Sequence, residues 1–137
     1  MNTLTGGCMC GEVRFEINNE PMAAALCHCK DCQKLPGSAF SSGLLFPKDS
    51  LHFKKNNASS YEYAGGSGAK MTRLFCKTCG TPIATIIGIF GDLCSVSSEA
   101  FDVASQCPSP SVSVNMNNSK HWVTLDDSIT KHQFGIS

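Results

Sequence analysis

Short stretches of alternating apolar and polar residues recur along most of the chain. Residues 12–17 show this most clearly, because polar residues separate Val13, Phe15 and Ile17. A period of two residues is typical of a half-buried β-strand. Similar alternating or apolar stretches predict further strands at residues 40–46, 51–54, 61–63, 71–75, 83–90, 93–96, 112–116 and 122–125. The pattern therefore predicts a mainly β fold built of short strands.

Helix is predicted in one short segment only. Residues 30–35 can form at most one or two turns before Pro36 and Gly37 end them. The glycine-rich stretch 65–68 predicts a flexible loop, and it lacks the helix signal and the Lys-Ser/Thr pair of a phosphate-binding loop. The chain has no internal repeat and no shift in composition that would mark a second domain. We therefore expect a single domain over residues 1–137 with little helix.

Charge and hydropathy exclude several classes of function. Eleven Lys and Arg residues balance eleven Asp and Glu residues, and the sequence pI is about 6.9, so no basic surface is expected to attract nucleic acid. The longest apolar stretch, residues 83–90, is far shorter than the roughly 20 residues of a membrane-spanning helix. The first residues lack the pattern of a secretion signal. We therefore expect a cytoplasmic protein with no nucleic-acid or membrane partner.

Nine cysteines among 137 residues far exceed what packing requires. Their number is odd, and seven of them gather in tight clusters, which disfavours a disulfide framework. The clusters contain Cys8 and Cys10, then Cys27, Cys29 and Cys32, and finally Cys76 and Cys79. Thiolates at such close spacing can converge on one zinc ion. The clusters therefore predict metal binding.

The clustered cysteines divide most simply into a set of three and a set of four. The set of three can surround an ion from one short segment and consists of Cys27, Cys29 and Cys32. The set of four would join the start of the chain to its middle and consists of Cys8, Cys10, Cys76 and Cys79. Four protein ligands are typical of structural zinc, whereas three with an open position are typical of catalytic zinc. We therefore predict two zinc ions per chain, one structural and one catalytic.

The other candidate ligands have weaker support. His28 lies between two predicted ligands, so we expect its ring to point away from the metal. Asp31 is compatible both with a general base and with a solvated side chain. Cys94 and Cys107 are isolated in the sequence, as core cysteines often are, but either could complete the set of three. The remaining histidines have no motif around them.

Several segments carry a resemblance to a known family. Residues 6–13, 27–32, 37–40, 73–82 and 120–122 read Gly-Gly-Cys-Met-Cys-Gly-Glu-Val, Cys-His-Cys-Lys-Asp-Cys, Gly-Ser-Ala-Phe, Arg-Leu-Phe-Cys-Lys-Thr-Cys-Gly-Thr-Pro and Lys-His-Trp. These segments resemble the glutathione-dependent formaldehyde-activating enzymes and the centromere protein V-like proteins of the same family. The resemblance implies a zinc-stabilised β-tent fold of short antiparallel strands and the same division of the cysteines into a structural and a catalytic zinc site.

The resemblance also implies a carbon–sulfur lyase, which in the best-known member joins formaldehyde to glutathione and forms S-(hydroxymethyl)glutathione. A zinc ion with three thiolate ligands prefers a soft fourth ligand, and a thiol such as glutathione meets that preference. We therefore predict a zinc-dependent enzyme that acts on a thiol or a thiol–aldehyde adduct. The carboxylates of glutathione would require cations, and Arg14 and Arg73 are the residues with a guanidinium group.

Two alternatives remain open at this stage. In the first, both zinc ions are structural and the protein is a binding module without catalysis. A fourth protein ligand at the middle cluster would favour this module, whereas an open position would favour the enzyme. In the second, the middle cluster is a redox sensor that loses its metal when a disulfide forms.

Overall fold

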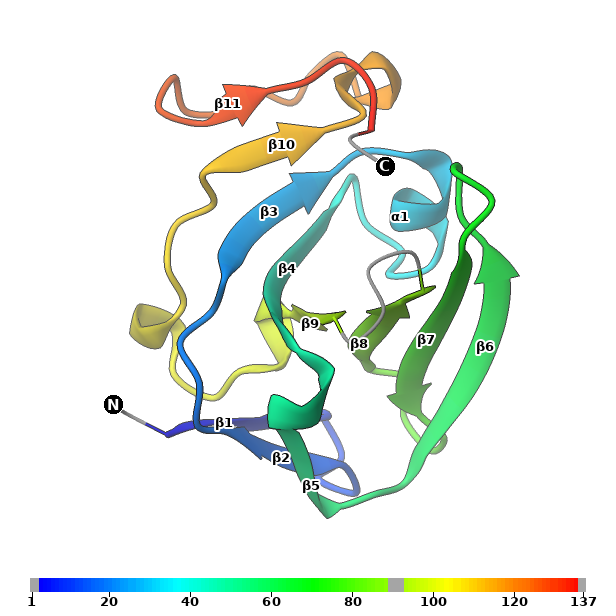
Figure 1. Ribbon diagram of the computed structural model, residues 1–137, viewed down its shortest axis with the longest axis vertical. Coiled ribbons are helices and arrows are strands. Elements are labelled where there is room, and N and C mark those ends of the chain that lie inside the picture. Colours follow the sequence, from blue (N-terminus) through cyan, green and yellow to red (C-terminus); the bar gives the residue numbers. More distant parts are fainter. Residues whose placement is uncertain (1–2, 89–92, 136–137) are drawn as a thin grey trace.

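The computed structural model describes residues 3–88 and 93–135. Short strands dominate this part of the chain (Figure 1). They are β1 (Leu4–Gly7), β2 (Arg14–Ile17), β3 (Ala23–Cys27), β4 (Ser41–Pro47), β5 (Leu51–Lys55), β6 (Ala58–Ala64), β7 (Lys70–Cys76), β8 (Pro82–Ile87), β9 (Leu93–Ser97), β10 (Val112–Val114) and β11 (Thr130–Lys131). The prediction of a mainly β fold is confirmed.

Helical structure in the described residues is limited to one α-helix and a few short 3-10 turns. The α-helix is α1 (Lys30–Lys34), and the 3-10 turns include η1 (Lys48–Ser50), η3 (Ser98–Ala100), η4 (Ala104–Gln106) and η5 (Met116–Asn118). The prediction of little helix is therefore confirmed. Within residues 3–88 and 93–135, no helix has the length and hydropathy that crossing a membrane requires.

The strands form two sheets. A three-stranded sheet has the order β1-β2-β5, and an eight-stranded sheet has the order β11-β10-β3-β4-β9-β8-β7-β6. In Figure 1 the small sheet closes one end of the molecule and the large sheet curves around the rest. The chain passes from one sheet to the other at Pro47, where β4 ends and η1 leads into β5.

Most neighbouring strands are antiparallel, as expected, but β10 is an exception. It pairs parallel to β3 on one side and to β11 on the other. Parallel neighbours need a long connection, and residues 115–129 supply one between β10 and β11. The parallel pairing matters for the site because it places the end of β10 beside Cys27 at the end of β3.

Large apolar side chains fill the space between the two sheets. Phe15 of β2 is almost fully buried and meets Phe101 edge to face, with 5.5 Å between the ring centroids. Phe46 of β4 packs against the other side of Phe101 at 6.3 Å. Burying side chains of this size stabilises a fold by about 1.5–3 kcal/mol each. The alternation of residues 14–17 therefore reflects a strand in which Phe15 and Ile17 face this core.

The strand predictions are confirmed with one exception and three omissions, of which the two-residue strand β11 is too short to show a pattern. Residues 122–125 form no strand: the N–H of Val123 closes a turn onto the carbonyl of Lys120, and the Trp122 side chain is 64% exposed. Residues 89 and 90 of the expected strand 83–90 lie outside the described residues. The expected strand 112–116 ends at Val114, because the backbone of Asn115 turns left-handed, with φ 58°. β1 and β3 were not expected, because glycine and alanine dominate them.

Candidate metal centres and the pocket beside them

The set of four cysteines lies in two turns that face each other. Cys8 and Cys10 follow β1, Cys76 is the last residue of β7, and Cys79 lies in the turn after it. Each turn is closed by backbone hydrogen bonds, among them Gly11 N–H to the Cys8 carbonyl at 3.3 Å and Gly80 N–H to the Cys76 carbonyl at 2.9 Å. Both glycines have positive φ, 85° and 78°, which other residues adopt only with strain. A glycine after each cysteine pair therefore lets the chain bring both sulfurs to the same side.

The four sulfur atoms have the spacing of a tetrahedral thiolate site. All lie within 4.8 Å of one another, and the Sγ atom of Cys10 is 3.6 Å from that of Cys8 and 3.7 Å from that of Cys76. Zinc–sulfur bonds of about 2.3 Å in a tetrahedron place sulfurs about 3.8 Å apart. The geometry and the soft donors fit a zinc ion.

Hydrogen-bond donors around this cluster favour negatively charged sulfur. The N–H of Val13 donates to Cys8 Sγ at 3.2 Å. The hydroxyl of Thr81 lies 3.1 Å from Cys79 Sγ, and this hydrogen bond lowers the pKa of Cys79 to about 5. Donors to a ligand sulfur stabilise its thiolate form and orient it. The surroundings are therefore suited to four thiolates around a cation.

The set of three cysteines lies where β3 passes into α1. Cys27 ends β3, Cys29 is the residue that caps α1, and Cys32 lies within the helix. Their sulfur atoms lie within 4.8 Å of one another. The backbone of Cys29 is extended, and its sulfur accepts a hydrogen bond from the Cys32 N–H at 3.3 Å. A strand end, a cap and the first turn of a short helix thus gather three sulfurs from six consecutive residues.

The electrostatics of this cluster also favour a cation. Hydrogen bonds from Cys29 and Cys32 lower the pKa of Cys27 to about 3, and the Nδ2 amide of Asn115 donates to Cys27 Sγ at 3.2 Å. The same crowding raises the pKa of Cys32, because Cys27 is then the charged member of the group. A divalent cation would allow all three to be thiolates. Among the described residues, no fourth Cys, His, Asp or Glu ligand atom joins this cluster.

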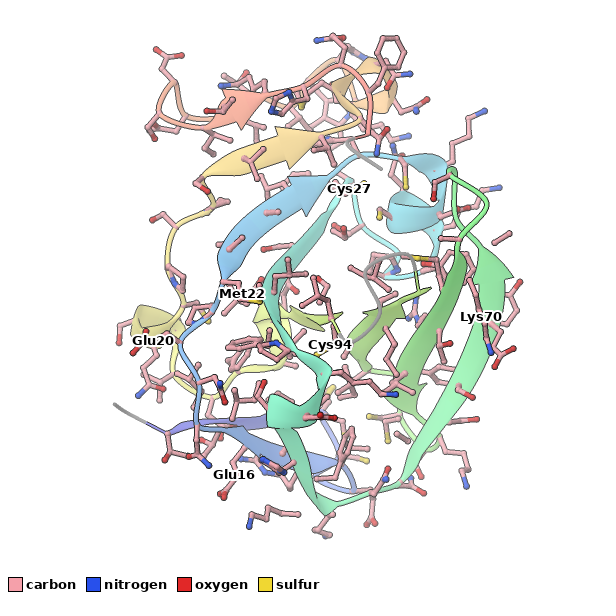
Figure 2. All side chains as sticks on the ribbon, in the orientation of Figure 1. Glu16, Glu20, Met22, Cys27, Lys70 and Cys94 are labelled. Carbon is pink, nitrogen blue, oxygen red and sulfur yellow. The ribbon has the colours of Figure 1, made fainter. Side chains whose placement is uncertain are left out.

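Neither isolated cysteine completes the set of three. Cys94 is fully buried in β9, and Figure 2 shows it well apart from Cys27. The Cys107 thiol lies 3.8 Å from the carbonyl oxygen of Ser98. Cys94 packs in the apolar core, where burial raises its pKa to about 11. The possibility that either residue supplies the missing ligand is therefore excluded by the geometry.

His28 lies in the interior and away from the sulfur cluster. Its side chain is fully buried and packs against Phe40, with 5.0 Å between ring centroids. Neither ring nitrogen has a hydrogen-bond partner among the described residues, and burial lowers the pKa of His28. Asp31, by contrast, is exposed on α1. The alternation of directions in an extended segment explains why the middle residue of Cys-His-Cys points opposite to its neighbours.

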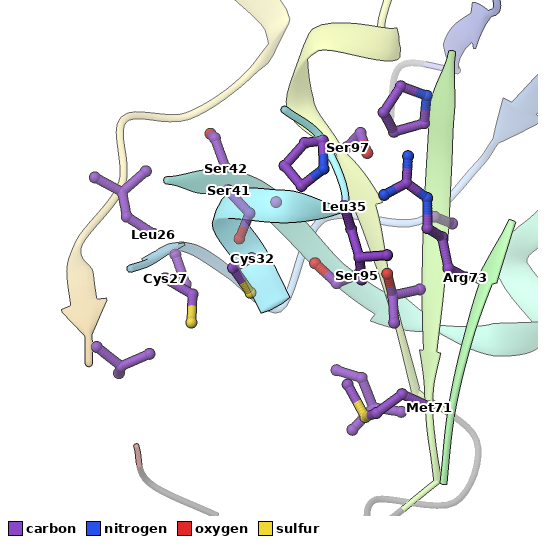
Figure 3. A pocket seen from close by; sticks show the side chains of 18 of the residues that line it. Leu26, Cys27, Cys32, Leu35, Ser41, Ser42, Met71, Arg73, Ser95 and Ser97 are labelled. Atoms are coloured by element: carbon purple, nitrogen blue, oxygen red, sulfur yellow. The ribbon is translucent and has the colours of Figure 1, made fainter. Parts of the chain in front are cut away.

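A cavity of about 240 Å³ opens beside the set of three cysteines. Cys27 and Cys32 form part of its wall (Figure 3). Apolar side chains from β3, α1, β7, β8 and β10 line most of the rest: Leu26, Leu35, Pro36, Met71, Ile87 and Val114. Among the described residues of the wall, Tyr63 and Arg73 are the ionisable side chains besides the cysteines. Hydroxyl groups also line it, from Ser41, Ser42, Thr85, Ser95 and Ser97. The three-cysteine cluster thus adjoins a space large enough for a small molecule.

The pocket and Asn115 could not be found from the sequence motifs. Asn115 lies 88 positions from Cys27, and no cysteine or histidine near it signals a role. Its only sequence signal is that asparagine tolerates left-handed backbone better than most residues. The pocket walls come from strands whose pairing the alternation pattern does not reveal.

Comparison with known proteins agrees with the motifs. A model of the family described as glutathione-dependent formaldehyde-activating enzyme matches residues 3–118. The chain belongs to this family. The match spans both cysteine sets, the pocket walls and Asn115.

The chain is also similar to one curated protein and to one solved structure. An uncharacterised lyase of Schizosaccharomyces pombe is 31% identical over 78 residues, which cover 57% of this chain and 53% of the relative. The match thus covers about half the length of that relative. A crystal structure of a Rhodobacter sphaeroides protein superposes with a TM-score of 0.56 at 24% identity, covering 72% of this chain and 87% of that one. At that identity the structural likeness shows a shared fold.

Proposed function

We propose that this protein is a zinc-dependent carbon–sulfur lyase that joins a thiol, such as glutathione, to an aldehyde such as formaldehyde. The observation that carries the proposal is the three-thiolate cluster on the wall of a pocket. In this proposal, one zinc ion is structural and one is catalytic. The structural ligands are Cys8, Cys10, Cys76 and Cys79, and the catalytic ligands are Cys27, Cys29 and Cys32. Membership of the family and the lyase relative support the reaction class.

The proposed reaction adds the sulfur of the thiol to the carbonyl carbon. A sulfur–carbon bond forms, the carbonyl π bond breaks, and the thiol proton passes to the carbonyl oxygen, so no oxidant or reductant is required. Zinc bound at the three cysteines would supply the positive charge that favours the thiolate form of the substrate. Asn115 orients the Cys27 sulfur, and the apolar walls limit access of water.

The main alternative is a binding module with two structural zinc ions. A closed structural site normally has four protein ligands. In the described residues the middle cluster offers three, and it borders a cavity. These two features favour the enzyme.

Residues 1–137 are proposed to form one domain, and the unpaired state of all nine cysteines is consistent with a reducing compartment such as the cytoplasm.

Replacing Cys32 with serine tests the proposed catalytic role. We expect Cys32→Ser to lose at least about 100-fold in turnover of glutathione and formaldehyde, because a hydroxyl is a poor zinc ligand compared with a thiolate. Circular dichroism should show an intact β fold. Cys107→Ser is the matched control, since Cys107 lies outside both clusters and should keep its turnover within about twofold. Full turnover by a folded Cys32→Ser variant would refute the proposed mechanism.

A further inference from the structure

The two arginines of the chain have opposite surroundings. Arg14 forms a bidentate ion pair with the carboxylate of Asp102, which also accepts a hydrogen bond from the Thr5 hydroxyl at 2.8 Å. Arg73 has no ion pair and no side-chain hydrogen bond with any of the residues 3–88 and 93–135. The guanidinium of Arg14 is therefore used within the fold, whereas that of Arg73 is available.

Arg73 is also partly buried. It lies on the wall of the pocket beside Tyr63, with its guanidinium carbon 5.9 Å from the centre of the Phe75 ring. Burial lowers its pKa, so the surroundings offer it less stabilisation than water does. A partly desolvated charge without a partner is unfavourable unless an opposite charge joins it. An anion in the pocket would provide that compensation.

The position of Arg73 relative to the cysteines defines what could bind. In Figure 3, Cys27 and Cys32 lie on one side of the pocket and Arg73 lies on the other, with Leu35 between them. A molecule that fills the pocket can therefore place one end at the sulfur cluster and the other at the guanidinium. Its middle would contact both apolar side chains, such as Leu35, and hydroxyl groups, such as that of Ser95.

Tyr63 adds a neutral donor to the wall of the same pocket. It lines the pocket with Arg73, and burial raises its pKa to about 12. The phenol therefore stays protonated at neutral pH and can donate a hydrogen bond to an anion without adding negative charge. A planar guanidinium and a phenol together suit a carboxylate, because the guanidinium fork matches its two oxygens.

We propose that Arg73 binds a carboxylate of the substrate and so makes the site specific for acidic thiols. The substrate class is a small thiol, such as a cysteine-containing peptide, with a carboxylate several bonds from its sulfur. This inference rests on the proposed function, because it assigns the sulfur of the same molecule to the three-cysteine site. Arg73 is a specificity-determining residue in this arrangement and takes no part in bond formation.

Binding measurements can test the carboxylate site separately from catalysis. The ligand is S-methylglutathione, whose sulfur cannot become a thiolate, and it is compared with its dimethyl ester by calorimetry on the zinc-loaded protein. The native protein should bind the acid at least about tenfold more tightly than the ester, as expected for charge-assisted hydrogen bonds. Arg73→Gln should remove this preference, and Arg73→Lys should restore part of it, since lysine keeps the charge but lacks the fork.

Arg14→Gln is the matched control. It removes the same guanidinium group from a residue outside the pocket and should leave the acid preference unchanged. Equal binding of acid and ester by the native protein would overturn the proposal, and so would an undiminished preference in Arg73→Gln. Failure of S-methylglutathione to bind the native protein would overturn it as well.

Turnover measurements separate this inference from the proposed function. With glutathione and formaldehyde, Arg73→Gln should raise KM at least about tenfold and change kcat less than about threefold, whereas KM for 2-mercaptoethanol should not change. A large fall in kcat with unchanged KM would contradict a role in binding. If the native protein prefers the acid but turns over no thiol, the carboxylate site stands and the proposed lyase activity fails.

Discussion

At the scale of single residues, the spacing of the cysteines carries most of the predictable information. Sulfurs that are close in sequence, such as Cys27, Cys29 and Cys32, lie close in space because the chain between them is too short to separate them. Residues that reach a site from a distant part of the chain, such as Asn115, have no comparable signal in the sequence. The sequence alone does not distinguish the two arginines, whereas the structure shows that Arg14 pairs with Asp102 and that Arg73 has no ion pair with any residue in 3–88 or 93–135.

Asn115 gives a test at this scale. Its amide donates to the Cys27 sulfur at 3.2 Å from a backbone with φ 58°. Asn115→Gly removes the donor but keeps a residue that tolerates this backbone, so loss of the hydrogen bond is separated from strain. We expect zinc affinity at the three-cysteine site to fall by about 10- to 100-fold, as measured by competition with a chelator. Unchanged affinity would show that the amide has no influence on the metal site.

At the scale of elements, alternation predicts a strand only where one face of the segment has a sheet to join. Residues 14–17 alternate and pack into the core, whereas residues 122–125 are mostly apolar but have no sheet neighbour and form no strand. β3 is a strand that the sequence pattern does not predict. Ala24 and Leu26 are buried, but its alanines give only a weak alternation signal. Local pattern and tertiary context therefore both decide which segments become strands.

The glycine turns of the four-cysteine site give a test at the scale of elements. Gly80 has φ 78°, and a Cβ atom added there would meet no atom within 4 Å. Gly80→Ala should therefore destabilise the protein by about 1 kcal/mol through backbone strain alone, measured by urea unfolding of the zinc-loaded protein. Gly66→Ala is the control, because its surroundings are equally open and its φ is not positive. Equal stability of the two variants would contradict this account of the turn.

At the scale of the whole molecule, the two cysteine sets differ in their location: one lies between the two sheets and the other lies beside the pocket. Cys8 and Cys10 follow β1 of the small sheet, whereas Cys76 ends β7 of the large one and Cys79 comes shortly after, so an ion there would link both sheets. The set of three lies at the end of β3 beside a cavity. Sequence spacing predicts the two groups of cysteines. The parallel pairing of β10 and the closure of the pocket depend on contacts between distant segments and do not follow from local pattern.

The central claim is that one zinc ion holds the sheets together and the other lies at an accessible catalytic site. Metal analysis during stepwise treatment with a chelator tests it most directly, with circular dichroism and turnover followed in the same samples. We expect two zinc ions per chain, of which the first to leave takes the activity with it while the β fold persists, and the second leaves only with unfolding. A single tightly held ion, or activity that survives loss of the first ion, would contradict the account.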